Sequence, residues 1–97
     1  MKNFIMILTL DLRLPAAKSL KDRRTVVSSI KEKLKNKYEL LINEKKENDN
    51  FKKSSLYIVG LSSDKNYLYK IYEKLTDYII SNYEVLIVDE NIEMMVV

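Results

Sequence analysis

The chain has 97 residues, with 17 lysine and arginine residues against 14 aspartate and glutamate residues and a formal net charge of +3. This length predicts one domain, spanning residues 1–97, that folds around a single core. Cysteine and histidine are absent, which excludes disulfides and removes the usual zinc ligands, thiol nucleophiles and commonest general base. We therefore expect no metal site, no cofactor and no enzymatic activity.

The first predicted element is a strand over residues 4–14, because every even position there is apolar, the pattern of a strand with one buried face. Asp11 and Arg13 interrupt the apolar run, so the segment is too short for a secretory signal or a membrane span. We expect a cytoplasmic protein that does not bind membranes. Pro15 ends the strand because it has no backbone N–H.

A helix is predicted over about residues 20–36. Ser19 followed by Asp22 resembles a capping box, which marks the start of a helix. The apolar residues fall within about a third of the helical wheel; they are Leu20, Val26, Val27, Ile30 and Leu34.

Arg23 lies near the middle of that apolar arc, at a position where leucine is the ordinary choice. Two roles are open for it. Its guanidinium either pairs with a carboxylate such as Asp11 or Glu44, or binds an anionic ligand.

The remaining elements follow in quick succession. Alternation from Tyr38 predicts a second strand, the polar segment "KENDNFKKS" predicts a hairpin loop, and residues 55–62 predict a third strand. Asp64 caps a second helix over about residues 65–81, and residues 83–97 form a fourth strand. The buried face of the second helix is predicted to contain Leu68, Ile71, Leu75, Tyr78 and Ile79.

The element order βαββαβ predicts the fold class. Right-handed crossovers place both helices on the same face of a four-stranded antiparallel sheet, which is a ferredoxin-like α+β sandwich. Acylphosphatases share this architecture but require a glycine-rich phosphate loop. The corresponding segment here, "PAAKSLKDRR", has no glycine.

Positive charge is concentrated in the first part of the chain. Residues 1–53 contain 14 basic and 7 acidic side chains, whereas residues 54–97 contain 3 and 7. On the first helix, spacings of three and four residues form a basic stripe about 20 Å long, made of Lys21, Arg24, Ser28, Lys31 and Lys35. Arg13 and Lys18 precede the helix and extend the stripe, and Arg23 would orient its corner.

A stripe of this kind matches the spacing of a phosphate backbone. We therefore expect the protein to bind RNA, such as a ribosomal particle, through these cations. The alternative is that the stripe is only a solvated surface.

The sheet face opposite the helices is predicted to be apolar, with Ile5, Ile7, Tyr57, Val59 and Leu61 on it. Only one of these residues is aromatic, which argues against base stacking on the sheet. Because monomers seldom leave large apolar patches wet, this face predicts a homodimer or a protein partner.

The segment "LRLPAAKSLKDRR" resembles the start of the YlxP-like family of small bacterial proteins of unknown function, in which a Leu-Arg-Ile-Pro-like turn precedes Ser-Leu-Lys-Glu-Lys-Arg. The segment "LYIVGLSSD" resembles the third strand of that family. Alanine stands at position 16, where the family often has glycine. The resemblance implies a ferredoxin-like domain and, through gene neighbours that include a ribosome-binding factor and a translation initiation factor, a link to ribosome maturation.

Overall fold

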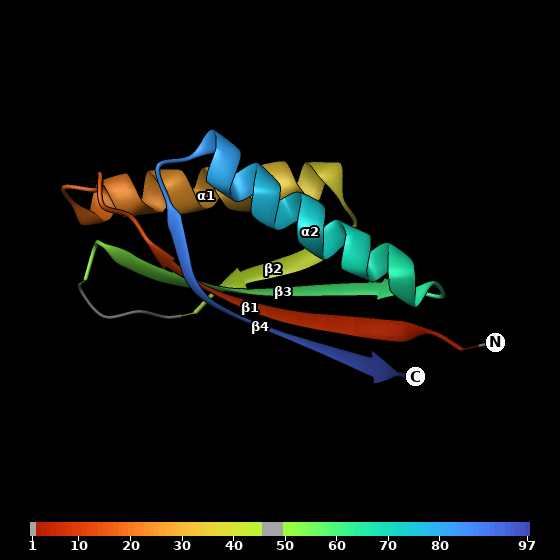
Figure 1. The fold of residues 1–97 in the computed structure, drawn as a ribbon. Helices are drawn as coiled ribbons and strands as arrows, with labels where there is room; N and C mark the ends of the chain where they lie inside the picture. The colour runs from red at the N-terminus through yellow and green to blue at the C-terminus, as the bar shows by residue number, and fades with distance from the viewer. Residues whose placement is uncertain (1, 46–49) are drawn as a thin grey trace.

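The computed structural model describes residues 2–45 and 50–97. The elements are β1 (Phe4–Arg13), α1 (Leu20–Lys37), β2 (Leu40–Glu44), β3 (Lys53–Ser62), α2 (Lys65–Asn82) and β4 (Leu86–Val96). The strands form one antiparallel sheet in the order β2-β3-β1-β4, and both helices cover the same face of it (Figure 1). The predicted ferredoxin-like α+β fold is confirmed.

The core lies between the sheet and the two helices. On β1, the even positions from Met6 to Leu12 are completely buried, as the period of two predicts. The helices contribute apolar residues that recur every three or four positions: Val27, Ile30 and Leu34 from α1, and Leu68, Ile71, Leu75 and Ile79 from α2.

Tyr78 was predicted on the buried face of α2 but is only half-buried. Its ring packs edge-on against Tyr83, with centroids 6.3 Å apart, and the Lys37 ammonium lies 4.7 Å from its centroid. The hydroxyl of Tyr83 in turn bonds the Ser29 hydroxyl at 2.8 Å. Tyr78 therefore belongs to a polar and aromatic seam that joins the end of α2 to α1.

The starts of three strands differ from the prediction. β4 begins at Leu86 and not at residue 83, because the Tyr83 backbone N–H donates to the Ile79 carbonyl and closes α2. β2 begins at Leu40 and not at Tyr38, because the Tyr38 backbone N–H donates to the Leu34 carbonyl and closes α1. β3 begins at Lys53, inside the segment predicted to be a loop, because Lys53 and Ser54 pair with the end of β1. The other part of that predicted loop, residues 46–49, lies outside the described residues. None of the described helices is long and apolar enough to cross a bilayer.

Candidate nucleic-acid interface and open sheet face

The start of α1 is fixed by two hydrogen bonds. The Asp22 backbone N–H donates to Ser19 Oγ at 3.1 Å, and the Lys18 backbone N–H donates to Asp22 Oδ2 at 2.8 Å. The Ser19 hydroxyl thus satisfies one donor that a helix leaves free at its first turn, as predicted, whereas Asp22 accepts from the residue before the cap and not from Ser19 as in a standard capping box. Lys18 and Lys21 are exposed at this start of the helix.

The basic stripe lies on the exposed side of α1. Lys21, Arg24 and Lys35 are exposed and Lys31 is partly exposed, so the helical spacing places them as predicted. Within residues 2–45 and 50–97, the structure contains one ion pair, between Arg23 and Glu44. None of the described carboxylates lies within ion-pair distance of a cation of the stripe. Lys31 and Lys35 line a shallow hollow of about 330 Å³ together with Ser28, Glu32 and Asn36.

Arg13 does not lie beside this stripe. It is the last residue of β1, on the sheet face opposite the helices, and it pairs directly with Lys53 of β3. Its Nη1 donates to the Leu12 carbonyl at 3.1 Å. The alternation of β1 explains this position, because odd residues of that strand point away from α1. The expected extension of the stripe therefore consists of Lys18 alone.

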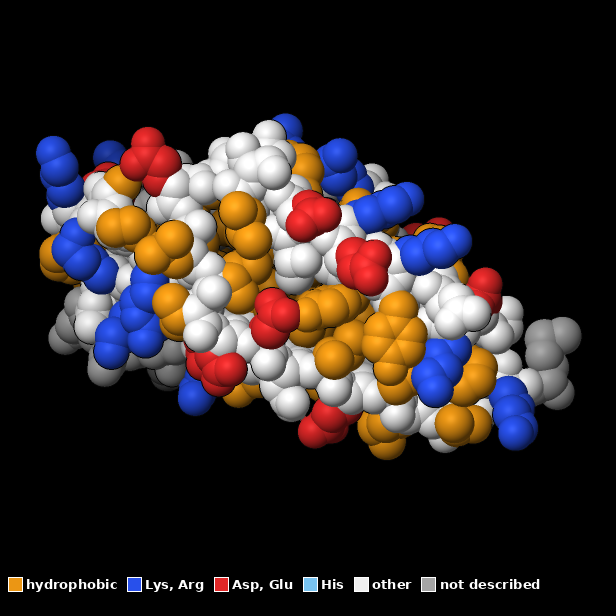
Figure 2. All heavy atoms as spheres, viewed as in Figure 1, with side chains coloured by type: hydrophobic (Ala, Val, Ile, Leu, Met, Phe, Trp, Pro, Cys, Tyr) orange, Lys and Arg blue, Asp and Glu red, His pale blue; other side chains and the backbone are white. Residues whose placement is uncertain are grey.

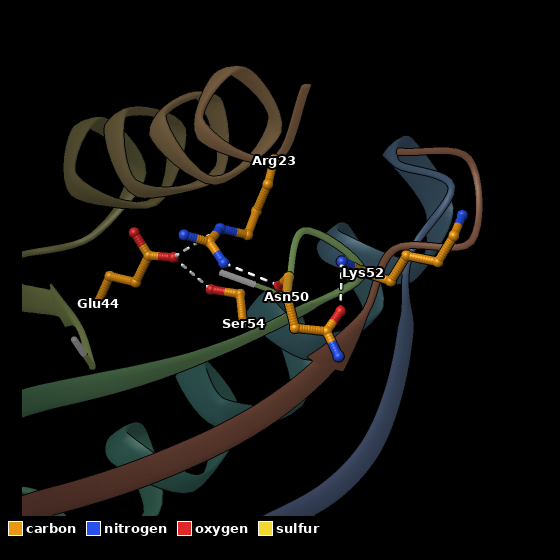
Figure 3. A network of polar contacts seen from close by, with 5 residues as sticks. All are labelled: Arg23, Glu44, Asn50, Lys52 and Ser54. Carbon is orange, nitrogen blue, oxygen red and sulfur yellow. Dashed lines mark hydrogen bonds and ion pairs between the residues drawn. The ribbon is translucent and has the colours of Figure 1, made fainter. Parts of the chain in front are cut away.

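Arg23 is directed from α1 toward the sheet and is only 8% exposed (Figure 3). Its Nη1 donates to the Asn50 carbonyl at 2.9 Å, and its Nε lies 3.9 Å from Glu44 Oε2. The same carboxylate oxygen accepts a 2.6 Å hydrogen bond from Ser54 Oγ. Of the two roles left open, the structure therefore contains the ion pair with Glu44, and Arg23 is not on the exposed stripe.

The other carboxylate considered for Arg23, Asp11, lies on the opposite face of the sheet. It accepts a 2.6 Å hydrogen bond from Ser55 Oγ. Strand alternation separates it from Arg23, since odd positions of β1 face away from the helices.

Lys52 is a structural residue that the sequence did not reveal. Its Nζ donates to the carbonyls of Pro15 and Ala17, each at 2.9 Å, and its own carbonyl accepts the Leu14 N–H at 2.9 Å. Figure 3 shows this residue beside Asn50, whose Oδ1 accepts the Lys52 backbone N–H at 3.0 Å. The end of the β2–β3 connection is thereby tied to the turn from which α1 starts.

The open sheet face carries the predicted apolar residues side by side. Ile5 pairs with Leu61, and Ile7 pairs with Val59, across β1 and β3. Two residues extend this patch that were not predicted: Leu41 of β2 is 74% exposed and Met95 of β4 is 48% exposed. Strand alternation in β2 and β4 also predicts that these two residues face outward, but the prediction covered only residues of β1 and β3.

A groove of about 650 Å³ runs along the β2 side of this face. Its lining is mainly apolar, and its charged members are Lys35 at the end of α1 and the acidic Glu39. The lining includes Ile5, Lys35, Tyr38, Leu41, Val59 and Leu61.

Acidic side chains are concentrated away from α1. Asp89, Glu90 and Glu93 all belong to β4 and are exposed. Figure 2, viewed from the α2 side, shows acidic side chains mainly over the middle of this face and lysine and arginine side chains toward its ends. The charge asymmetry of the sequence is thus a spatial one between α1 and β4.

Among the described residues, one titratable group has a clearly shifted pKa. The Tyr72 hydroxyl donates to a Glu90 carboxylate oxygen, and this hydrogen bond, followed by burial, raises the pKa of Tyr72 to about 12. Tyr72 joins α2 to β4, far from the basic stripe. In the part of the chain that the structure describes, acidic residues form no cluster of three that could hold a metal ion.

These features define a small ferredoxin-like α+β domain with one cationic helix and one apolar sheet face. Residues 5–92 match the family model described as "Protein of unknown function (DUF503)", and the chain belongs to that family. A search of curated proteins gives no match.

Two solved structures show the same fold at low sequence identity. The de novo designed protein Ferredog-Diesel is 10% identical, with a TM-score of 0.51 over 92% of this chain and 83% of its own. A variant of SnoaB, a cofactor-independent oxygenase from Streptomyces nogalater, is 6% identical, with a TM-score of 0.54 over 94% of this chain and 90% of its own. Likeness at this level concerns the fold alone.

Proposed function

We propose that this protein binds RNA, and in particular ribosomal RNA or a ribosome-assembly particle, through phosphate contacts made by the basic stripe of α1. The contacting residues are Lys18, Lys21, Arg24, Lys31 and Lys35. Arg13 and Arg23 are left out, because one lies on the opposite sheet face and the other is buried against Glu44.

The observation that carries the proposal is the row of exposed cations without a described acidic partner. Like charges placed along one helix face repel each other and weaken the helix slightly. The core does not require them, since their side chains point away from it. A polyanion that meets several of them at once gains affinity by releasing counterions.

The form of the stripe suggests what is recognised. Lysine and arginine on a helix surface can meet phosphate oxygens about every 5–6 Å along a stripe of about 20 Å. Such contacts carry no base information, so selectivity would come from the shape of the RNA. The resemblance to the YlxP-like family adds support for a ribosomal target, through the gene neighbours of that family.

The test compares two triple substitutions that remove equal charge from helices of equal length. Replacing Lys21, Arg24 and Lys31 with glutamine removes the centre of the stripe, and replacing Lys65, Lys70 and Lys74 with glutamine makes the same change on α2. Lys35 is kept in both variants because it also lines the groove on the sheet. Each variant is sedimented with purified ribosomal particles and titrated with a poly(U) probe.

The stripe variant should bind both much more weakly than wild type, while the α2 variant should bind as wild type does. Equal retention by the two variants would contradict the proposal. A circular dichroism spectrum of each variant serves as the control and tests whether its helices remain folded.

A second candidate function is a protein-interaction module that uses the open sheet face. It is supported by the contiguous exposure of Leu41, Leu61 and Met95 around the groove, since large apolar patches mark interaction sites. Under this hypothesis the basic stripe is only solvated, and ribosome association survives in the stripe variant. Replacing Ile7 and Val59 with aspartate should instead abolish the interaction.

A further inference from the structure

We propose that the open sheet face binds a second copy of this chain around a two-fold axis parallel to the strands, so that Glu93 of each copy meets Lys35 of the other. This inference rests on the second candidate function; it shares Lys35 with the proposed RNA-binding stripe, but the other four cations of that stripe take no part in it. It concerns the outer surface of β2 and β4, whereas the centre of the basic stripe lies on the other side of the sheet.

The apolar part of the face forms two adjacent rows across the strands. The first row consists of Leu61, Ile5 and Met95. The second consists of Leu41, Val59 and Ile7, and the acidic Glu93 stands at its end. Leu61 is 63% exposed and Leu41 is 74% exposed. Burying such a surface against a like surface is favourable at about 25 cal/mol per Å² of apolar area.

Charged side chains border this patch at both margins: Lys35 and Glu39 at the β2 edge and Glu93 on β4. Lys35 borders the groove at the β2 edge, and Glu93 projects from β4 in register with Ile7. Neither side chain has an ion-pair partner among the described residues. The surface is therefore apolar in the middle, with Lys35 beside the acidic Glu39 at the β2 edge and with Glu93 at the β4 side.

The placement of Lys35 at one margin and of Glu93 at the other points to a second copy and to its orientation. A two-fold axis parallel to the strands lays β4 of one copy over β2 of its partner, which brings Glu93 toward the partner's Lys35 twice. The same rotation places Met95 opposite the partner's groove, and the flexible thioether of methionine fills irregular apolar gaps. An axis perpendicular to the strands would instead oppose β4 to β4 and bring the two Glu93 carboxylates together.

Pairing through the exposed edge of β4 is a less favourable way to join two copies. The register of β4 shifts between Asp11 and Leu12 of β1, which marks a bulge, and Asp89 and Glu90 follow it along the edge. Bulges and charges are the features by which edge strands avoid pairing with one another. The sheet face is therefore the better interface.

The experiment is a charge swap followed by sedimentation velocity over a range of protein concentrations. Wild type should dimerise. Lys35→Glu and Glu93→Lys should each weaken the dimer by about tenfold or more, because each places like charges together. The double variant, which carries both changes, should recover wild-type dimerisation to within about threefold, since the pair is restored in reverse.

Two controls complete the design. Leu41→Asp should give a monomer, whereas Ile80→Asp, at a residue of α2 that is 56% exposed, should leave the dimer unchanged. A wild-type chain that stays monomeric, or a double variant as weak as either single variant, would overturn the proposal. The stripe variant with glutamine at 21, 24 and 31 should remain dimeric, so loss of RNA binding and loss of the dimer are separate outcomes.

Discussion

The two helices have the same role in the core but different outer surfaces. Both have 18 residues, both lie on the same face of the sheet, and each buries four residues at spacings of three and four. Outside that buried stripe, to which Arg23 belongs, α1 carries 6 basic and 2 acidic side chains, whereas α2 carries 3 and 2. The inner stripes are alike, so the two helices differ mainly in their outer charge, and the proposed RNA binding uses the outer surface of α1.

The largest expected effect is a loss of stability, and it tests whether the two inner stripes contribute equally to the core. Leu34 of α1 and Leu75 of α2 are both completely buried. Replacing either with alanine removes packed methyl groups and leaves a cavity, so each variant should lose about 2–5 kcal/mol of unfolding free energy. Urea denaturation measures this loss as a lower midpoint. A loss below about 1 kcal/mol at one of the two leucines would show that its helix contributes little to the core.

The boundary between the inner and outer surfaces of α1 falls between two adjacent arginines. Arg23→Gln removes a charged donor from the Asn50 carbonyl and leaves the Glu44 carboxylate without its ion pair. We expect it to lower the unfolding free energy by about 1.5–3 kcal/mol. Arg24→Gln, at an exposed position, should change it by less than about 0.5 kcal/mol.

For RNA binding, unlike stability, Arg24→Gln should have the larger effect of the two variants. Arg24→Gln should weaken association with poly(U), and Arg23→Gln should leave it unchanged under conditions where the protein is folded. Equal stability losses for the two variants would contradict the assignment of Arg23 to the interior.

The smallest expected effect concerns the seam between α2 and β4. Because folding raises the pKa of Tyr72 from 10.0 to about 12, the folded state holds this proton more tightly than the unfolded chain. The contact therefore contributes its full stabilisation below pH 10, and the contribution is lost as the pH rises toward 12.

A tyrosinate absorbance titration should show one late-ionising group that disappears in Tyr72→Phe. In Glu90→Ala that group should ionise near its ordinary pKa, because the hydrogen bond that raises it has been removed. An unchanged titration in Glu90→Ala would contradict the role given to Glu90.

The sequence predicted most of the fold because its apolar periodicity is regular. Period two along β1 and period 3.6 along both helices arise from backbone geometry, so they can be read without tertiary information. The boundaries that differed, at Tyr38, Lys53 and Tyr83, depend on helix-closing hydrogen bonds and on pairing with β1. Such contacts join residues whose partners the local pattern does not identify.

The site was predictable in part for the same reason. Helical spacing placed Lys21, Arg24, Lys31 and Lys35 on one exposed side, and strand alternation placed Ile5 and Ile7 on the open face. Alternation also shows that Arg13 faces away from α1, although its closeness in sequence to Lys18 suggested otherwise.

The contacts of Arg23 and Lys52 could not be derived from local pattern. Their bonds to Asn50, Pro15 and Ala17 join segments 27 to 37 positions apart in the sequence. They depend on how the β2–β3 connection folds against the turn before α1, which periodicity does not describe.

The most direct test of the account is the salt dependence of poly(U) binding by wild type and the two triple variants. About five phosphate contacts predict that log affinity falls against log salt with a slope of about −3 to −4 for wild type. The α2 variant should give the same slope, and the stripe variant, with three fewer contacts, a slope of roughly −1 to −2. A flat response in wild type, or equal slopes in the stripe and α2 variants, would contradict the claim that the cations of α1 bind RNA.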